Sequence, residues 1–262
     1  MESELHIRLL HYNFFRIDQG WRTRNVYDSY WRLYINNCNG AGAILPDGRF
    51  AIPANRVVFI PAWVRFDCHC VRPIRHFYVH FDVVGLTDRI VRSLFNRPFA
   101  LETKINFARL GGLLKRKGPG AAELCRVKAL VYRYFSELLD RLPNPQAEEL
   151  ARSLSARNRF AATLRYIEHH LSEPLTNDRL AKLSHMSESH FAHQFKDLMD
   201  ETPARFVLQH RIAAAARFLL FTSDPIDTIC ERTGFANRFH FSRNFKKLMG
   251  VTPAAYRKAS RV

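Results

Sequence analysis

The C-terminal part of the chain contains an internal repeat, and this repeat restricts the possible folds more than any other feature. When the sequence is shifted by 50 residues, 191–206 aligns with 241–256, and 8 of the 16 positions are identical. Chance would leave about one identity in such a stretch, so the region is a duplicated structural unit. The identical pairs are Phe191/Phe241, Phe195/Phe245, Lys196/Lys246, Leu198/Leu248, Met199/Met249, Thr202/Thr252, Pro203/Pro253 and Ala204/Ala254.

Each copy of the repeat predicts two helices joined by a short turn. In the second copy, Gly234 suits the left-handed conformation that ends a helix, and Asn237 can cap the next one, as Ser187 can in the first copy. Further predicted caps, each followed by proline, are Thr202, Asp224 and Thr252. Such a helix-turn-helix can place its second helix in the major groove of DNA. The two predicted units span about 176–199 and 225–249.

The outward-facing residues of the second copy are rich in donors and positive charge. They are Arg238, His240, Ser242, Arg243, Lys246 and Lys247. The chain has a net charge of +16, shared equally between residues 1–150 and 151–262. Arginine can bind a guanine edge and lysine can neutralise a phosphate, so these residues favour double-stranded DNA as a partner. The alternative, a solvated helix face, is weakened by the duplication.

A dense set of residues in this region follows a known signature. The set comprises Arg211, Ala215, Leu219, Ile226, Ile229, Gly234-Phe235, Phe241-Ser242-Arg243-Asn244-Phe245-Lys246-Lys247, Gly250, Thr252-Pro253 and Tyr256-Arg257. On these residues the region 159–262 closely resembles the AraC/XylS family of bacterial transcription regulators. The resemblance implies an all-α domain of seven helices, whose two helix-turn-helix units enter two adjacent major grooves.

The resemblance also implies DNA-contacting positions in both units. They fall on Ser189, Ala192, His193 and Lys196 in the first unit, and on Arg238, Phe239, Ser242, Arg243 and Lys246 in the second. His193 stands where the family often has arginine, and Ala192 brings no hydrogen bond. We therefore expect the first unit to contribute mainly shape and phosphate contacts.

Residues 1–142 differ in character, which predicts an α+β chain of two domains. Aromatic and β-branched residues at 30–35, 57–60 and 77–81 predict short strands separated by turns. This region resembles the cupin-like sensor domain of many such regulators, which implies a β-barrel followed by dimerisation helices. The polar segment 143–158 begins with two prolines and predicts a linker between the domains, part of which can be helical.

One predicted strand suggests a ligand pocket. His76, Tyr78 and His80 alternate with apolar residues along it. If this polar face looks into the barrel, the three side chains line a pocket with Trp31 and Cys68; if it faces solvent, the phenylalanines between them form the core. The family resemblance implies a small effector, with a sugar as the candidate class, because aromatic rings with hydrogen-bonding groups suit it.

Residues 86–140 predict helices, with apolar spacings of three and four at 86–95 and 105–114. A heptad seam follows at Leu124, Val127, Val131, Tyr134 and Leu138. Two interpretations remain open. The seam is either the interface of a homodimer that binds two half-sites, or the buried face of a helix packed on its own barrel.

Several classes of protein are disfavoured. The apolar runs are too short to span a membrane and the N-terminus has no apolar signal core, which predicts a cytoplasmic protein with no membrane partner. The five cysteines form no CxxC pair, and Cys68-His69-Cys70 would place its side chains on opposite faces of a strand. Because clustered His and Glu ligands are also missing after Pro61, we expect no metal, no cofactor and no enzyme activity.

These features predict a sequence-specific, ligand-responsive transcription factor. An effector that binds one of two states better would alter how the DNA-binding domains are presented. The family resemblance favours an activator, with RNA polymerase as a further partner. The alternatives are a barrel used only for dimerisation or partner docking, and a cupin enzyme with an appended DNA-binding module.

Overall fold

The computed structural model describes residues 5–110 and 120–259, which form two compact domains that divide between Leu150 and Ala151. The N-terminal domain is built on strands and the C-terminal domain is helical, so the predicted α+β architecture of two domains is confirmed. Within the described ranges, no helix is long and apolar enough to cross a bilayer.

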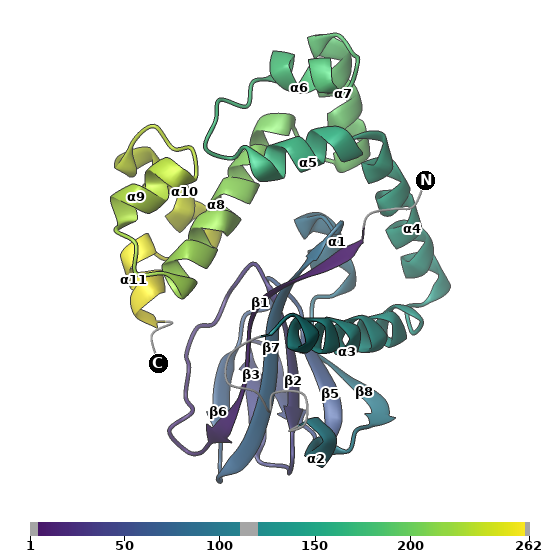
Figure 1. The fold of residues 1–262 in the computed structure, drawn as a ribbon, viewed down its shortest axis with the longest axis vertical. Helices are drawn as coiled ribbons and strands as arrows, with labels where there is room; N and C mark the ends of the chain where they lie inside the picture. The colour runs from purple at the N-terminus through teal and green to yellow at the C-terminus, as the bar shows by residue number, and fades with distance from the viewer. Residues whose placement is uncertain (1–4, 111–119, 260–262) are drawn as a thin grey trace. The chain divides into compact units, whose positions relative to one another are not determined.

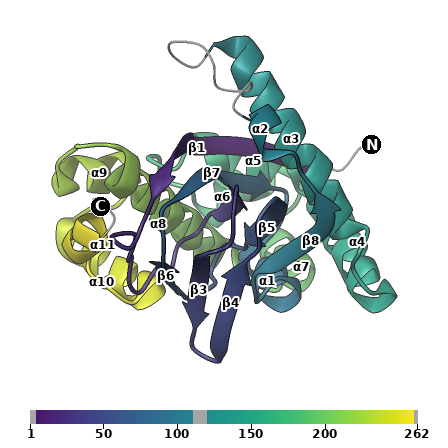
Figure 2. The same cartoon turned by 90° about the horizontal axis from the view of Figure 1, so that it is seen from below.

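The N-terminal domain contains two antiparallel sheets (Figures 1 and 2). The five-stranded sheet has the order β1-β7-β2-β5-β8, and the three-stranded sheet has the order β4-β3-β6. No ladder joins the sheets in the described part of the chain, so the strands form two layers and not the closed barrel expected from the sequence. The strands are β1 (His6–Ile17), β2 (Trp31–Asn36), β3 (Ala41–Leu45), β4 (Gly48–Ile52), β5 (Arg56–Ile60), β6 (Asp67–Cys70), β7 (Ile74–Val84) and β8 (Phe99–Lys104).

The five-stranded sheet is covered on both faces. Figure 2 shows α3 (Ala121–Leu139) on one side of it and the three-stranded sheet on the other. On the helical side, Trp31 packs edge-on against Phe95 and Phe135, with ring centroids 5.1 and 5.3 Å apart. On the other side, Tyr34 belongs to the apolar cluster that fills the space between the sheets. Strand β2 is consequently buried along its whole length.

The heptad seam packs within its own chain. Val127, Val131, Tyr134 and Leu138 are buried in the single chain, whereas Leu124 is 38% exposed. The dimer interface predicted at these five positions is therefore corrected for four of them, because an amphipathic helix needs one buried face and α3 already has it. The structure favours the other interpretation, a helix packed on its own sheets.

Other predicted elements shift in type or length. Strand β1 lies in the region 1–84, which was expected to form strands although this one was not located individually, whereas β8 interrupts a region expected to be helical. Of the helix expected at 105–114, only α2 (Phe107–Leu110) is seen, because the remainder reaches beyond the described residues. Helix α1 (Asp88–Leu94) forms as expected, capped by Thr87, whose hydroxyl accepts the N–H of Ile90 at 3.2 Å.

The segment predicted as a linker is a helix. Helix α4 (Asn144–Arg159) runs across the boundary between the two domains and contains nearly all of 143–158. Pro145 lies in its first turn, where its missing N–H costs no intrahelical bond. The prolines lie between the end of α3 and the first turn of α4, and the helical part of the predicted linker extends over nearly all of it.

In the described residues 160–259, the C-terminal domain contains seven further helices, as expected. They are α5 (Ala161–His169), α6 (Asn177–Leu183), α7 (Glu188–Met199), α8 (Pro203–Phe221), α9 (Ile226–Arg232), α10 (Arg238–Met249) and α11 (Pro253–Ala259). Helices α6 and α7 form the first helix-turn-helix unit, and α9 and α10 form the second. Helix α8 runs from one unit to the other (Figure 1).

The caps predicted in the repeat are confirmed with one exception. The hydroxyls of Ser187, Thr202 and Thr252 each accept a backbone N–H three residues further on, at 3.3–3.4 Å. Asp224 does not cap α9: Pro225 occupies that position, and the Asp224 carboxylate pairs with Arg232 instead. An ion pair with a side chain eight residues ahead competed with the local cap.

Candidate nucleic-acid interface

Helix α10 of the second helix-turn-helix is capped at both ends. Oδ1 of Asn237 accepts the N–H of His240 at 2.8 Å, and Gly250 ends the helix in the left-handed region with a φ of 81°. Phe241 and Phe245 are fully buried beneath the helix, with ring centroids 5.6 Å apart. These contacts fix which face of α10 points outward.

That outward face is strongly cationic. Arg238, Arg243, Lys246 and Lys247 are exposed, and α10 contains no acidic residue. Ser242 is half-buried between them, so its hydroxyl lies nearer to the helix surface than the long cationic side chains do. Such a face offers guanidinium forks and ammonium groups to phosphates and base edges without a competing carboxylate on the same helix.

Two side chains at the start of α10 have distinct environments. Nη1 of Arg238 donates to the carboxylate of Asp227 on α9 at 3.1 Å, which holds this guanidinium beside the turn. Phe239, the next residue, is 90% exposed, more than any other exposed large apolar side chain described. Single exposed apolar side chains are common on proteins, so Phe239 is a candidate contact residue only because it lies beside Arg238 at the start of this cationic helix.

The first helix-turn-helix repeats the architecture with a different surface. Residues 191–200 and 241–250 show the same order of buried, half-buried and exposed positions. On α7, however, Nε2 of His193 lies 3.2 Å from the carboxylate of Asp197, and Lys196 is the only lysine or arginine of the helix. Ser189 is exposed and Ala192 half-buried. The first unit therefore presents the expected residues, but with far less positive charge than the second.

The residues predicted for an effector pocket divide between the two faces of the sheet. His76, Tyr78 and His80 lie on the face that looks toward the three-stranded sheet, where Cys68 also lies. Trp31 lies on the opposite face among the phenylalanines, so its assignment to this pocket is wrong. Side chains alternate along a strand, and Trp31 has the other parity from Tyr34, which stacks edge-on with His76 at 4.7 Å.

Burial changes the titration of this polar face. Desolvation lowers the pKa of His76 to about 3 and raises that of Tyr78 to about 12. The pKa of His80 is also lowered, by desolvation first and then by the charge of Arg32. Desolvation raises the pKa of Cys68 to about 12, so this thiol stays protonated at neutral pH. The face is therefore neutral at its histidines and cysteine.

Sequence reasoning missed a charged group at the centre of this face. Arg32 is buried on β2, where its guanidinium donates to the carboxylate of Asp28 and, at 3.0 Å, to the hydroxyl of Tyr30. Nη1 of Arg32 and Nδ2 of Asn36 are buried without a hydrogen-bond partner. The signal was available in the printed sequence, because an arginine inside the strand Trp31–Asn36 must be either exposed or paired.

The described residues contain no group of three or more His, Cys, Asp or Glu side chains that could hold a metal ion. Cys68 and Cys70 are buried on β6 and His69 has the opposite parity, as the alternation of a strand requires. The residues predicted to contact DNA and the polar face between the sheets are the two candidate sites.

The helical C-terminal domain is similar to a known family. Residues 180–259 match the family model described as a helix-turn-helix domain, which covers both units of the repeat. The C-terminal domain is of the AraC type. The resemblance to the AraC/XylS family that the sequence predicts is therefore confirmed, and in this AraC-type domain α7 and α10 occupy the positions of the recognition helices.

Individual relatives cover the chain to different extents. An uncharacterised HTH-type transcriptional regulator of Bacillus subtilis, YobQ, is 31% identical over 76 residues, which is 29% of this chain and 32% of that protein. The chain therefore spans about a third of the length of this curated relative. ToxT of Vibrio cholerae is 13% identical, but its structure covers 97% of this chain and 100% of its own, with a TM-score of 0.55. This second similarity concerns the fold, and it extends over both domains.

Proposed function

We propose that this protein is a sequence-specific DNA-binding transcriptional regulator whose second AraC-type unit supplies most of the DNA affinity. The observation that carries the proposal is the exposed face of α10, with four cationic side chains, no carboxylate and a solvent-exposed Phe239 at its start. A polyanion with grooves of regular width is the partner that such a helix suits. Such a regulator acts in the cytoplasm, where bacterial DNA lies.

The individual roles follow from position on the helix. Arg243 and Ser242 lie one turn into α10 and would reach base edges, whereas Lys246 lies one turn further and would bind a phosphate. Arg238, held by Asp227, would contact the backbone beside the turn. On α7, Ser189, His193 and Lys196 would add contacts in the adjacent major groove, with Lys196 on a phosphate.

The experiment that tests this function is selection from random duplex DNA at physiological salt. We expect an enriched motif whose strong element is read by the second unit; a weaker element about one helical turn away would come from the first unit. A motif with a single element would show that only the second unit reads bases. Failure to enrich any motif, combined with equal binding to all duplexes, would contradict sequence-specific regulation.

We also propose that a small effector binds between the two sheets of the N-terminal domain. Arg32 and Asn36 each leave one buried nitrogen unpaired there, and the rings of Tyr34, His76 and His80 lie on the same face of the sheet. Buried donors without acceptors cost free energy, which a ligand rich in acceptor oxygens would recover. A sugar has such oxygens, and so has a carboxylate.

Thermal melting separates effector binding from a purely structural domain. A ligand that binds only the folded protein at 100 times its Kd raises the free energy of unfolding by about 2.7 kcal/mol. We would screen sugars and, because one ToxT structure contains a bound unsaturated fatty acid, also fatty acids. The matched variant is Asn36→Leu, which removes one unpaired donor. The absence of any ligand-dependent shift would favour a domain that serves only dimerisation or partner docking.

Activation, RNA polymerase contact and homodimerisation complete the proposed function. Two half-sites in the selected motif, together with a sedimentation mass twice that of one chain, would support the homodimer. Transcription from a promoter that carries the motif, measured with purified polymerase, distinguishes activation from repression.

A further inference from the structure

Arg211 joins α8, the helix that connects the two helix-turn-helix units, to the loop between α5 and α6. It lies at the middle of α8, where its Nε donates to the carbonyl of Leu171 at 3.0 Å and its Nη2 to the carbonyl of Glu173 at 2.7 Å. A guanidinium presents its donors in one rigid plane, so two bonds to carbonyls two residues apart fix the loop in both position and direction. Desolvation lowers the pKa of Arg211, but the group stays charged at any physiological pH.

The same loop is tied to the first helix-turn-helix. The carboxylate of Glu173 accepts from Arg179 on α6 at 2.8 Å and lies 2.6 Å from Nδ1 of His170. The hydroxyl of Tyr166 on α5 donates to it at 3.4 Å. The loop is therefore bonded to the first unit, and Arg211 holds that unit through the backbone carbonyls of the loop.

The second unit reaches the same carbonyl from the other side. Gly234 lies in the turn between α9 and α10 with a φ of +76°, and a Cβ at this position would stand 2.1 Å from the carbonyl oxygen of Leu171. The same Cβ would stand 2.8 Å from Cζ of Arg211. Only a glycine allows this approach, so the turn of the second unit, the loop of the first unit and Arg211 meet at one point.

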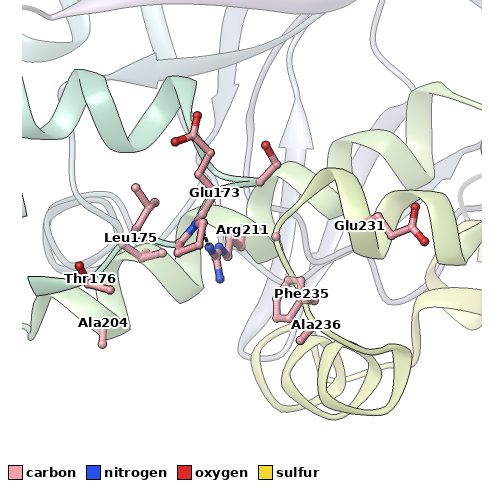
Figure 3. A pocket seen from close by; sticks show the side chains of 12 residues that line it. Glu173, Leu175, Thr176, Ala204, Arg211, Glu231, Phe235 and Ala236 are labelled. Atoms are coloured by element: carbon pink, nitrogen blue, oxygen red, sulfur yellow. Dashed lines mark hydrogen bonds between the residues drawn. The ribbon is translucent and has the colours of Figure 1, made fainter. Parts of the chain in front are cut away.

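An open groove lies beside this point. It has a volume of about 600 Å³ and is lined from both units, with Leu175 and Thr176 on one side and Phe235 and Ala236 on the other (Figure 3). Figure 3 shows the Arg211 side chain at the middle of the groove, close to Glu173. The buried apolar cluster of the first unit extends onto α8 only as far as Val207. Because an open groove separates the units here, polar contacts have more influence on their relative position.

We propose that Arg211 is a positioning residue that sets the distance and twist between α7 and α10, and thereby the spacing of the two DNA elements that one protomer can bind. This inference rests on the proposed DNA-binding function. One added base pair moves the second element by about 3.4 Å and rotates it by about 35° around the DNA axis. A rigid pair of units rejects that displacement, whereas a pair hinged on α8 alone accommodates it.

The test measures affinity against spacing. The selected DNA motif is prepared with its central spacer shortened or lengthened by one and two base pairs. For the wild-type protein, we expect one added or removed base pair to weaken binding by about tenfold or more. Arg211→Met should weaken binding at the best spacing and reduce the penalty for one base pair to about threefold or less. Arg205→Met is the control, because it removes the same charge from the exposed start of α8.

Two further variants keep the test decisive if Arg211→Met folds poorly. Arg211→Lys keeps the charge but lacks the rigid planar donors that fix the direction of the loop, and Gly234→Ala opens the contact from the second unit; both should flatten the spacing profile. An equal loss of affinity at every spacing, or an unchanged profile in a variant with a normal melting curve, would overturn the role of Arg211. A wild-type protein without any sequence preference would instead overturn the proposed function, and the role of Arg211 with it.

Discussion

Nε2 of His193 lies 3.2 Å from the carboxylate of Asp197 on α7, one turn further along the helix. The equivalent positions of α10 are Arg243 and Lys247, both exposed. The two copies of the repeat therefore share their buried positions but differ in the charge that they present. The fold constrains the buried positions, so the exposed ones can carry different charges without a change in the packing.

The first prediction concerns this difference in charge. Asp197→Lys gives α7 the cation that α10 has at the same position, and it removes the carboxylate that faces His193. We expect tighter binding to all duplexes and a steeper dependence of affinity on salt, by about one unit of slope for each added phosphate contact. Titration of labelled duplexes at several salt concentrations measures both. An unchanged slope would mean that this face of α7 does not approach DNA.

The second prediction separates base reading from phosphate binding on α10. Arg243→Ala should weaken binding to the selected motif by about 1–3 kcal/mol and relax the base preference at one position. Lys246→Ala should weaken binding to all sequences alike and flatten the salt dependence. Binding of each variant to the motif and to scrambled duplexes distinguishes the two. A uniform loss for Arg243→Ala would reassign this residue to a phosphate.

The third prediction assigns a partner to Phe239. An exposed phenylalanine at the start of a recognition helix can pack on the methyl group of thymine. Replacing thymine by uracil removes only that methyl group, so one such replacement in the motif should weaken wild-type binding. Phe239→Ser should bind both DNAs with equal affinity. If every thymine of the motif can be replaced without loss, Phe239 does not read a methyl group.

The fourth prediction is a pH dependence of stability. Folded His76 is neutral because burial lowers its pKa to about 3, whereas the unfolded imidazole has its ordinary pKa of 6.5. Below pH 6.5 the unfolded chain binds more protons, so the free energy of unfolding falls as the pH decreases from about 6.5 toward 3. The contribution of one histidine approaches about 1.4 kcal/mol per pH unit.

His80 acts in the same direction. Urea unfolding of the N-terminal domain at pH 7, 6 and 5 measures the effect. His76→Gln should flatten the slope in this window, whatever it does to stability at pH 7. A slope that is identical in the variant would show that His76 is accessible to protons in the folded state.

The fifth prediction concerns the packing of α3. Phe135 packs against Trp31 at 5.3 Å and Phe59 at 6.0 Å, so Phe135→Ala should lower the free energy of unfolding by about 3–5 kcal/mol. Leu124→Ala, on the exposed side of the same helix, should change it by about 0.5 kcal/mol or less. Chemical denaturation with sedimentation of both variants is the measurement. A loss of dimer mass in Leu124→Ala would place this residue in a subunit interface.

The sequence by itself determined the C-terminal domain in some detail. The duplication, the caps at Ser187 and Asn237, and the glycine at 234 are local signals, because capping and turn conformations depend on a few neighbouring residues. The same signals placed both recognition helices and their exposed faces. Local signals failed only where a more distant group competed, as at Asp224 with Arg232.

Only the tertiary structure decided the N-terminal domain. Alternation along a strand defines two faces, but it does not say what covers each of them. Here α3 covers the face of Trp31, and the second sheet covers the face of Tyr34 and His76. The heptad spacing of α3 likewise defines an apolar stripe without naming its partner. Which surfaces meet depends on contacts between residues far apart in the chain, and those contacts leave no trace in a local pattern.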